Sequence, residues 1–132
     1  MIVVDSSVWI DFFNGIVTAE VERLRALMGQ QPLLVGDVML LEVLQGVASE
    51  PEARRVEIAL RQFDVAPLLS PGLAVQGAMN YRRLRRRGIT VRKSIDLILG
   101  TFCIANGHAL LTCDRDFAPM AAHLGLKLVQ QN

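Results

Sequence analysis

Five acidic residues stand where the chain could hold a cation: Asp5, Glu42, Asp96, Asp114 and Asp116. Two like charges about 4 Å apart repel by roughly 4 kcal/mol at an effective dielectric constant of about 20. Several such pairs would rival the stability of a whole small domain, about 5–15 kcal/mol, so a cluster persists only when protons or a cation neutralise it. Mg²⁺ and Mn²⁺ prefer oxygen ligands, and a coordinated water with a lowered pKa can attack a phosphodiester. The set therefore predicts a divalent-metal site for phosphodiester hydrolysis.

Three of these acids follow apolar runs that read as strands. Asp5 directly follows Ile2–Val4, and both Asp114 and Asp116 come shortly after Ala109–Leu111. Such positions also suit helix capping, because Asp is a good N-cap residue. Taken singly, each could be only a cap.

The other two acids lie in apolar helical segments. Glu42 shares one helical stripe with Gly46, and Asp96 shares one with Gly100. A glycine inside a helix costs up to about 1 kcal/mol, so we interpret both glycines as clearing space beside a carboxylate. The alternatives are a buried salt bridge between Glu42 and an arginine, and a helix-dipole role for Asp96.

Three further acids are expected to have structural roles. We expect Asp37 to cap a helix, Asp11 to face solvent, and Asp64 to lie at the opposite edge of the sheet because it precedes a strand.

One stretch of the chain is strongly basic. Residues 65–95 contain no acid but hold seven of the fourteen basic residues. Arginine has a planar fork that suits phosphate oxygens. We predict RNA contacts for four arginines of this stretch: Arg82, Arg85, Arg86 and Arg92. The alternative is an ordinary exposed helix end, where cations are favourable anyway.

Short runs rich in Val and Leu predict strands, and amphipathic segments between them predict helices. The strands are expected at Ile2–Val4, Leu33–Val35, Val65–Leu68, Ala109–Leu111 and Lys127–Val129, and helices at Thr18–Met28, Asp37–Ala48, Pro51–Gln62, Pro71–Arg87 and Ser94–Asn106. This alternation predicts one α/β domain over residues 1–132, a parallel-sheet α/β/α sandwich with helices on both faces. Ligands of such folds bind beyond the carboxyl ends of the strands.

Composition narrows the class of protein. The chain has 132 residues, 52% of them hydrophobic and 20% charged, which favours a compact domain with apolar surface left for self-association. No segment approaches the roughly 20 apolar residues of a membrane span, and Met1–Val4 is too short for a signal-peptide core, so we expect a cytoplasmic protein without membrane contact. Cys103 and Cys113 are expected to be buried and reduced. His108 and His123 show no zinc-ligand spacing.

Four motifs in register resemble the PIN-domain nucleases, and within them the VapC-type toxins of toxin–antitoxin pairs. They are the opening Val-Val-Asp5-Ser6-Ser7-Val-Trp-Ile, Glu42-x-x-x-Gly46, Ser94-Ile-Asp96-Leu-Ile, and Thr112-Cys-Asp114-Arg-Asp116-Phe117. The resemblance implies that Asp5, Glu42, Asp96 and Asp114 hold Mg²⁺ or Mn²⁺, with Asp5 and Asp96 as direct ligands. Asp116 would be an accessory carboxylate. Ser6 and Thr112 would orient the aspartates.

The resemblance also implies an RNA substrate, a homodimer and a cognate antitoxin that blocks the site. The expected activity is a metal-dependent endoribonuclease. Because no histidine pair is present for 2′-hydroxyl chemistry, we predict in-line attack of a metal-activated water, departure of the 3′ oxygen and a 5′-phosphate end. One departure from the family pattern is Leu99-Gly-Thr-Phe-Cys103, where small Ala-rich sequence is more usual.

Other functions fit the chain less well. A phosphotransfer receiver needs an Asp on the third strand, and Val65–Leu68 has none. A phosphatase with an aspartyl nucleophile needs a second Asp two residues after the first, and that position is Ser7. The remaining alternative is a non-catalytic PIN-like module that binds RNA or a partner.

Overall fold

The computed structural model describes residues 1–129, so the last three residues of the predicted 1–132 domain lie outside the described residues. The elements follow one another in this order: β1 (Ile2–Val4), α1 (Ser6–Phe13), α2 (Ala19–Leu27), β2 (Leu33–Gly36), α3 (Asp37–Gln45), α4 (Glu50–Leu60), β3 (Asp64–Ala66), α5 (Pro71–Arg86), α6 (Ser94–Asn106), β4 (Ala109–Leu111), the 3₁₀ helix η1 (Arg115–Phe117), α7 (Ala118–Leu124) and β5 (Lys127–Leu128).

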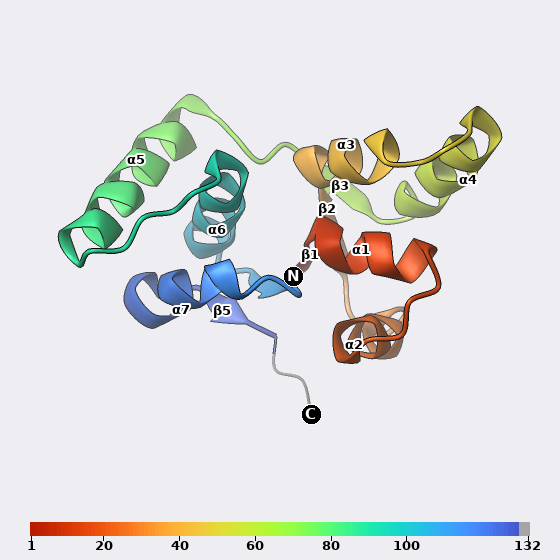
Figure 1. The fold of residues 1–132 in the computed structure, drawn as a ribbon, viewed down its shortest axis with the longest axis horizontal. Helices are drawn as coiled ribbons and strands as arrows, with labels where there is room; N and C mark the ends of the chain where they lie inside the picture. The colour runs from red at the N-terminus through yellow and green to blue at the C-terminus, as the bar shows by residue number, and fades with distance from the viewer. Residues whose placement is uncertain (130–132) are drawn as a thin grey trace.

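The five strands form one parallel sheet in the order β3-β2-β1-β4-β5. In the central strand, Ile2 pairs with Leu33 on one side and with Ala109 on the other. Figure 1 shows helices α1–α4 together on one side of the sheet and α5–α7 on the other. The predicted parallel α/β/α sandwich is confirmed. The chain leaves β1 toward β2 and returns to β4 on the other side, so the topological switch point lies between β1 and β4.

The central strands form because branched apolar residues suit a sheet that is covered on both faces. All residues of β1 and β2 are buried. The edge strand β3 differs from the buried strand expected at Val65–Leu68, since Asp64 and Val65 are exposed and the strand ends at Ala66. Pro67 ends it, because proline has no N–H to donate to the sheet.

Most helices begin and end where the sequence predicts. The hydroxyls of Thr18, Ser49 and Ser70 accept N–H bonds at the starts of α2, α4 and α5. Gly107 ends α6 at φ 68°, a left-handed conformation that glycine adopts easily. Helix α7 was not predicted, because seven residues with Pro119 in the first turn give too short a periodic pattern.

Gly100 packs helix α6 against helix α7. It is buried, and a Cβ at this position would overlap the Met120 Sδ atom. The prediction that Gly100 clears space beside Asp96 is therefore wrong. Glycine is required at this position because helices α6 and α7 contact each other there.

Gly100→Ala is expected to destabilise the protein by about 1–3 kcal/mol, because Met120 is 1% exposed and must leave its packed position. Urea unfolding monitored by circular dichroism would measure the change. Gly72→Ala is the control, since a Cβ there meets nothing within 4 Å in the first turn of α5. Equal unfolding midpoints for the two variants would contradict the packing argument.

Two properties of the chain complete the description of the fold. Both cysteines are free, and burial raises the pKa of the Cys103 thiol to about 12 and that of the Cys113 thiol to about 11, so both are protonated at neutral pH. Cys103 is buried as expected, whereas Cys113 is only half-buried. None of the helices in residues 1–129 has the length and apolar character of a membrane span.

Candidate active site

Asp5 lies at the carboxyl end of β1, directly beside the switch point. Its Oδ1 atom accepts from the backbone N–H of Ser6 at 2.8 Å, which caps helix α1. Its Oδ2 atom accepts from the hydroxyls of Ser7 and Thr112, each at 2.8 Å. Capping and orientation are thus combined in one buried carboxylate, whose side chain is held by the first two residues of α1 and by the residue that follows β4.

Ser6 connects Asp5 with Glu42 on helix α3. The Ser6 hydroxyl donates to Glu42 Oε1 at 2.9 Å and lies 3.5 Å from Asp5 Oδ1. Within residues 1–129 the only ion pair joins Arg61 to Glu57, so the alternative of a Glu42 salt bridge is wrong. Glu42 is instead half-buried and held by a neutral donor.

Gly46 does not clear space for Glu42, contrary to the sequence interpretation. Helix α3 ends at Gln45 rather than at Ala48, and Gly46 is its C-cap residue. A Cβ at Gly46 would meet only backbone oxygens at ordinary contact distances, the nearest being Val43 O at 3.7 Å.

Three carboxylates come together at the start of α6 and in the turn after β4. One oxygen each from Asp96, Asp114 and Asp116 lies within 4.8 Å of the others. Asp114 caps the 3₁₀ helix η1, since its Oδ1 accepts from the N–H of Asp116 at 2.8 Å. The Thr112 hydroxyl accepts from the N–H of Asp114 at 2.9 Å, so it links this group to Asp5.

The charge on Asp96 is strongly disfavoured in this environment. Burial raises its pKa to about 6, and the charges of Asp114 and Asp5 add to the increase, with a smaller contribution from Asp116. Lys93 opposes the shift. Because nearby anions contribute, a divalent cation would relieve the same repulsion.

The donor set fits a hard divalent cation. Carboxylate oxygens from three residues converge, which is the chemistry that Mg²⁺ and Mn²⁺ prefer. Asp116, expected to be accessory, belongs to this group. Asp5 and Glu42 lie outside it, and Asp5 approaches it closely enough to affect the pKa of Asp96.

The remaining acids have other surroundings. Asp11 was expected to face solvent, but it is half-buried and its Oδ2 lies 3.8 Å from the Cys113 sulfur, which donates to it. Asp37 is the first residue of α3 rather than its N-cap, and its Oδ1 accepts from the N–H groups of Val38 and Leu68. Asp64 begins β3 at the edge of the sheet opposite the carboxylates, as expected.

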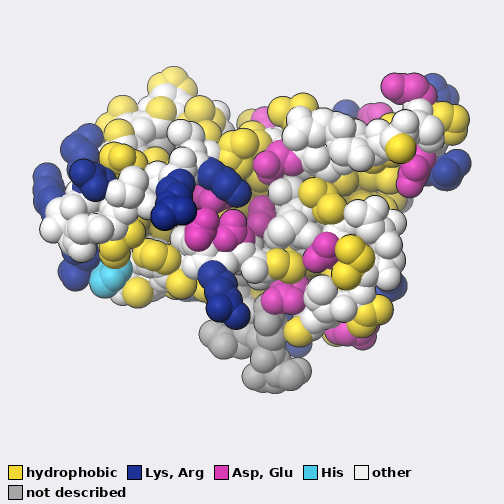
Figure 2. Space-filling view, in the orientation of Figure 1, with side chains coloured by type: hydrophobic (Ala, Val, Ile, Leu, Met, Phe, Trp, Pro, Cys, Tyr) yellow, Lys and Arg dark blue, Asp and Glu magenta, His cyan; other side chains and the backbone are white. Residues whose placement is uncertain are grey.

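The arginines of the basic stretch separate into two places. Arg82, Arg85 and Arg86 lie exposed on the last turns of α5, whereas Arg92 lines a hollow of about 270 Å³ together with Asp96 and Asp116. Figure 2 shows acidic side chains gathered in the middle of one face with basic side chains around them, and a separate basic group at the end of the molecule where α5 ends.

Sequence reasoning missed two residues of this region, Ser7 and Arg115. Ser7 donates to Asp5 and also accepts from the N–H of Cys113 at 3.3 Å, which ties the turns after β1 and β4 together. Its position in Asp5-Ser-Ser7 was the available signal. Arg115 lines the hollow that contains Asp96, and its place between two aspartates in the sequence was a signal of the same kind.

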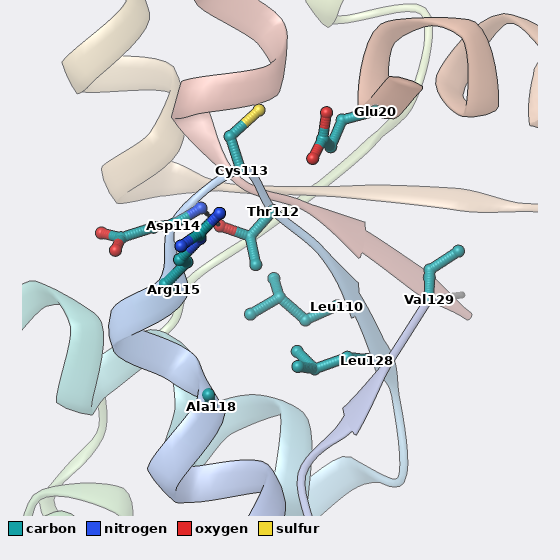
Figure 3. A pocket seen from close by; sticks show the side chains of 9 residues that line it. All are labelled: Glu20, Leu110, Thr112, Cys113, Asp114, Arg115, Ala118, Leu128 and Val129. Carbon is teal, nitrogen blue, oxygen red and sulfur yellow. Dashed lines mark hydrogen bonds between the residues drawn. The ribbon is translucent and has the colours of Figure 1, made fainter. Parts of the chain in front are cut away.

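A second hollow lies on the other side of the turn that carries Arg115. It has a volume of about 510 Å³, and Arg115 lines it as well. Figure 3 shows Leu110, Leu128 and Ala118 as its apolar lining, while the Asp114 carboxylate points away from it. Arg115 therefore stands between two hollows.

Thr112→Val is expected to weaken Mn²⁺ binding about 10–100-fold, because it removes a hydroxyl that orients Asp5 and accepts from Asp114. Isothermal titration calorimetry would measure the affinity. Thr101→Val is the matched control: Thr101 is 2% exposed and bonds Asn80 on α5 at 3.1 Å, away from the carboxylates. Equal losses of affinity in both variants would argue against a specific role for Thr112.

The sheet is parallel, and carboxylates gather at its switch point. These two features define an α/β protein with an acidic candidate active site. The chain belongs to the PIN domain family, whose model, described as "PIN domain", matches residues 2–122.

Its curated relatives include VapC ribonuclease Mb1587 of Mycobacterium bovis and Ribonuclease VapC11 of Mycobacterium tuberculosis. Each is 25% identical over 126 residues, covering 92% of both chains.

Solved structures share the fold. VapBC2 from Rickettsia felis, solved with a promoter DNA fragment, gives a TM-score of 0.78 at 16% identity and covers 100% of both chains. A toxin–antitoxin complex from Klebsiella pneumoniae gives 0.74 at 19% identity, covering 100% of this chain and 98% of that one.

Proposed function

We propose that this PIN-domain chain is a Mg²⁺- or Mn²⁺-dependent endoribonuclease, a VapC-type toxin that cleaves RNA and is neutralised by a cognate antitoxin. The observation that carries the proposal is the group of Asp96, Asp114 and Asp116 oxygens within 4.8 Å, beside Asp5 and Glu42, which the Ser6 hydroxyl connects. The named ribonucleases among the relatives and the toxin–antitoxin complexes among the structural neighbours support it. We also propose that the protein acts on RNA in the cytoplasm.

The residues of the site would have two different roles, holding the cation and positioning the acids. Asp96, Asp114 and Asp116 would hold the cation, with Asp5 and Glu42 as further ligands directly or through water. When bound, the cation supplies charge for the phosphate and lowers the pKa of a coordinated water. Ser6, Ser7 and Thr112 keep the acids in place without adding charge.

Cleavage of single-stranded RNA by the purified protein in Mn²⁺, with analysis of the new ends, tests the proposal. We expect 5′-phosphate ends, no cleavage in EDTA and an increase in thermal stability with Mn²⁺. A ligand at a hundred times its Kd should add about 2.7 kcal/mol. Ends with 2′,3′-cyclic phosphate would contradict the mechanism, and the absence of both cleavage and Mn²⁺ stabilisation would contradict the function.

A homodimer is also proposed, on the basis of exposed apolar side chains on the α5 side of the molecule. Val75 is 70% exposed, Met79 39% and Ile95 36%. Burying such groups between two copies is favourable at about 25 cal/mol per Å². Light scattering should give twice the 14.6 kDa chain mass, and a monomer at high concentration would contradict the dimer.

A further inference from the structure

Two arginines face the same hollow as the carboxylates, from different parts of the chain. Arg92 belongs to the loop before α6, and Arg115 is the first residue of η1. Both line the 270 Å³ hollow together with Asp96 and Asp116. The two guanidinium groups are thus brought to one place by elements that pack against each other.

Neither arginine forms an ion pair with its acidic neighbours in the described residues. Both are exposed, and within residues 1–129 the only ion pair is the one between Arg61 and Glu57. A guanidinium presents a rigid fork of N–H donors that matches phosphate oxygens. Unpaired guanidinium groups beside an anionic site would offset its repulsion of a polyanionic substrate.

The loop that carries Arg92 is held in place from α5. The Arg85 guanidinium donates to the Thr90 hydroxyl at 2.8 Å, and the N–H of Ile89 donates to the carbonyl of Leu84 at 2.9 Å. This gives Arg85 a positioning role. By contrast, Arg83, Arg86 and Arg87 line a separate hollow with His123.

We propose that Arg92 and Arg115 form a clamp on the RNA backbone, in which each guanidinium binds a phosphate next to the carboxylate group. The inference rests on the proposed function and adds the residues that position the substrate. Arg115 lines both the 270 Å³ and the 510 Å³ hollow, so an RNA strand that occupied both would pass its side chain.

RNA binding at several salt concentrations tests the clamp without requiring cleavage. A labelled single-stranded RNA oligonucleotide would be titrated with the Asp96→Asn variant and with the same chain carrying Arg92→Gln, Arg115→Gln or both. We expect each single change to weaken binding about tenfold near 0.1 M salt. Each should also lower the slope of log Kd against log salt by about 0.7, the value for one phosphate contact on a single strand, and the double change by about twice that.

Arg54→Gln is the matched control, because Arg54 is an exposed arginine on α4, outside the hollow that contains the carboxylates. It should leave the salt slope unchanged. In the chain with Asp96 intact, Arg115→Gln should lower kcat/KM while Mn²⁺ still raises the unfolding temperature. Arg115→Lys should recover only part of the loss, since the fork is absent.

Unchanged slopes in both arginine variants, or an equal loss in Arg54→Gln, would overturn the clamp. The clamp would also be overturned if the slopes of log Kd for RNA against log salt stayed unchanged while antitoxin binding weakened. That result would show that the arginines bind a protein. The two proposals can fail separately. If the salt slopes depend on Arg92 and Arg115 but the native chain never cleaves RNA, the clamp is supported and the proposed nuclease activity is refuted.

Discussion

Asp96→Asn is expected to lower kcat for RNA cleavage by at least about 10²–10³-fold, the size of effect seen when one preorganised electrostatic group is removed from an active site. Asp96 is the buried member of the three-carboxylate group, and it lies in the first turn of α6, where neighbouring packing fixes its position. The amide is nearly isosteric but carries no charge for a cation. Single-turnover cleavage of a labelled RNA in Mn²⁺ would measure the loss.

The same variant separates catalysis from simple binding. RNA affinity should change by less than about threefold, since the contacts proposed for the backbone come from arginines. Asp64→Asn is the control, because Asp64 is exposed at the opposite edge of the sheet. If Asp96→Asn cleaves as fast as the native chain, the carboxylate group is not the active site. If neither protein cleaves while both bind RNA, the chain is a binding module.

Asp96→Asn is also expected to stabilise the metal-free protein by about 2–3 kcal/mol at neutral pH. The pKa of Asp96 is raised from 3.8 to about 6 in the fold, and each pKa unit corresponds to about 1.36 kcal/mol. Because the folded state binds the proton more tightly than the unfolded state, the penalty is absent below pH 3.8. It grows as the pH rises to 6 and is complete above that.

Urea unfolding in EDTA at pH 4.5 and pH 7.5 would measure this effect. The advantage of Asp96→Asn over the native chain should be small at the lower pH and largest at the higher one. Mn²⁺ should reverse the order by stabilising only the native chain. An advantage that is the same at both pH values would show that the shape of the side chain, and not its charge, is responsible.

Local sequence signals predicted most of the fold. The strands at Ile2–Val4 and Ala109–Leu111 and the helix at Ser94–Asn106 have the predicted bounds, because apolar runs and cap residues define them without reference to the rest of the chain. The signals failed where tertiary contacts decide. Gly100 was assigned to the wrong neighbour because the sequence does not show that Met120 approaches it. Helix α7 has too few residues to show a period.

The acids and their clustering could be predicted from sequence, but the division into a group of Asp96, Asp114 and Asp116 with Asp5 and Glu42 outside it could not. The strand order brings the turns after β1 and β4 together, and the cap of η1 directs Asp116 toward Asp96. The role of Arg115 depends on the same turn. Its charge was visible in the sequence, but its position beside two hollows was not.

The bond between Thr112 and Asp5 spans 107 residues, nearly the whole length of the chain. The central strand β1 likewise pairs with β4, which lies 107 residues further on. Contacts of such high sequence separation slow folding, and synthesis delivers the amino-terminal half of the site first. A growing chain on the ribosome has Asp5 and Glu42 but lacks the groups that orient and complete the cluster. Assembly of the carboxylates therefore waits until Thr112, Asp114 and Asp116 have emerged, so the earlier part of the nascent chain carries no complete site.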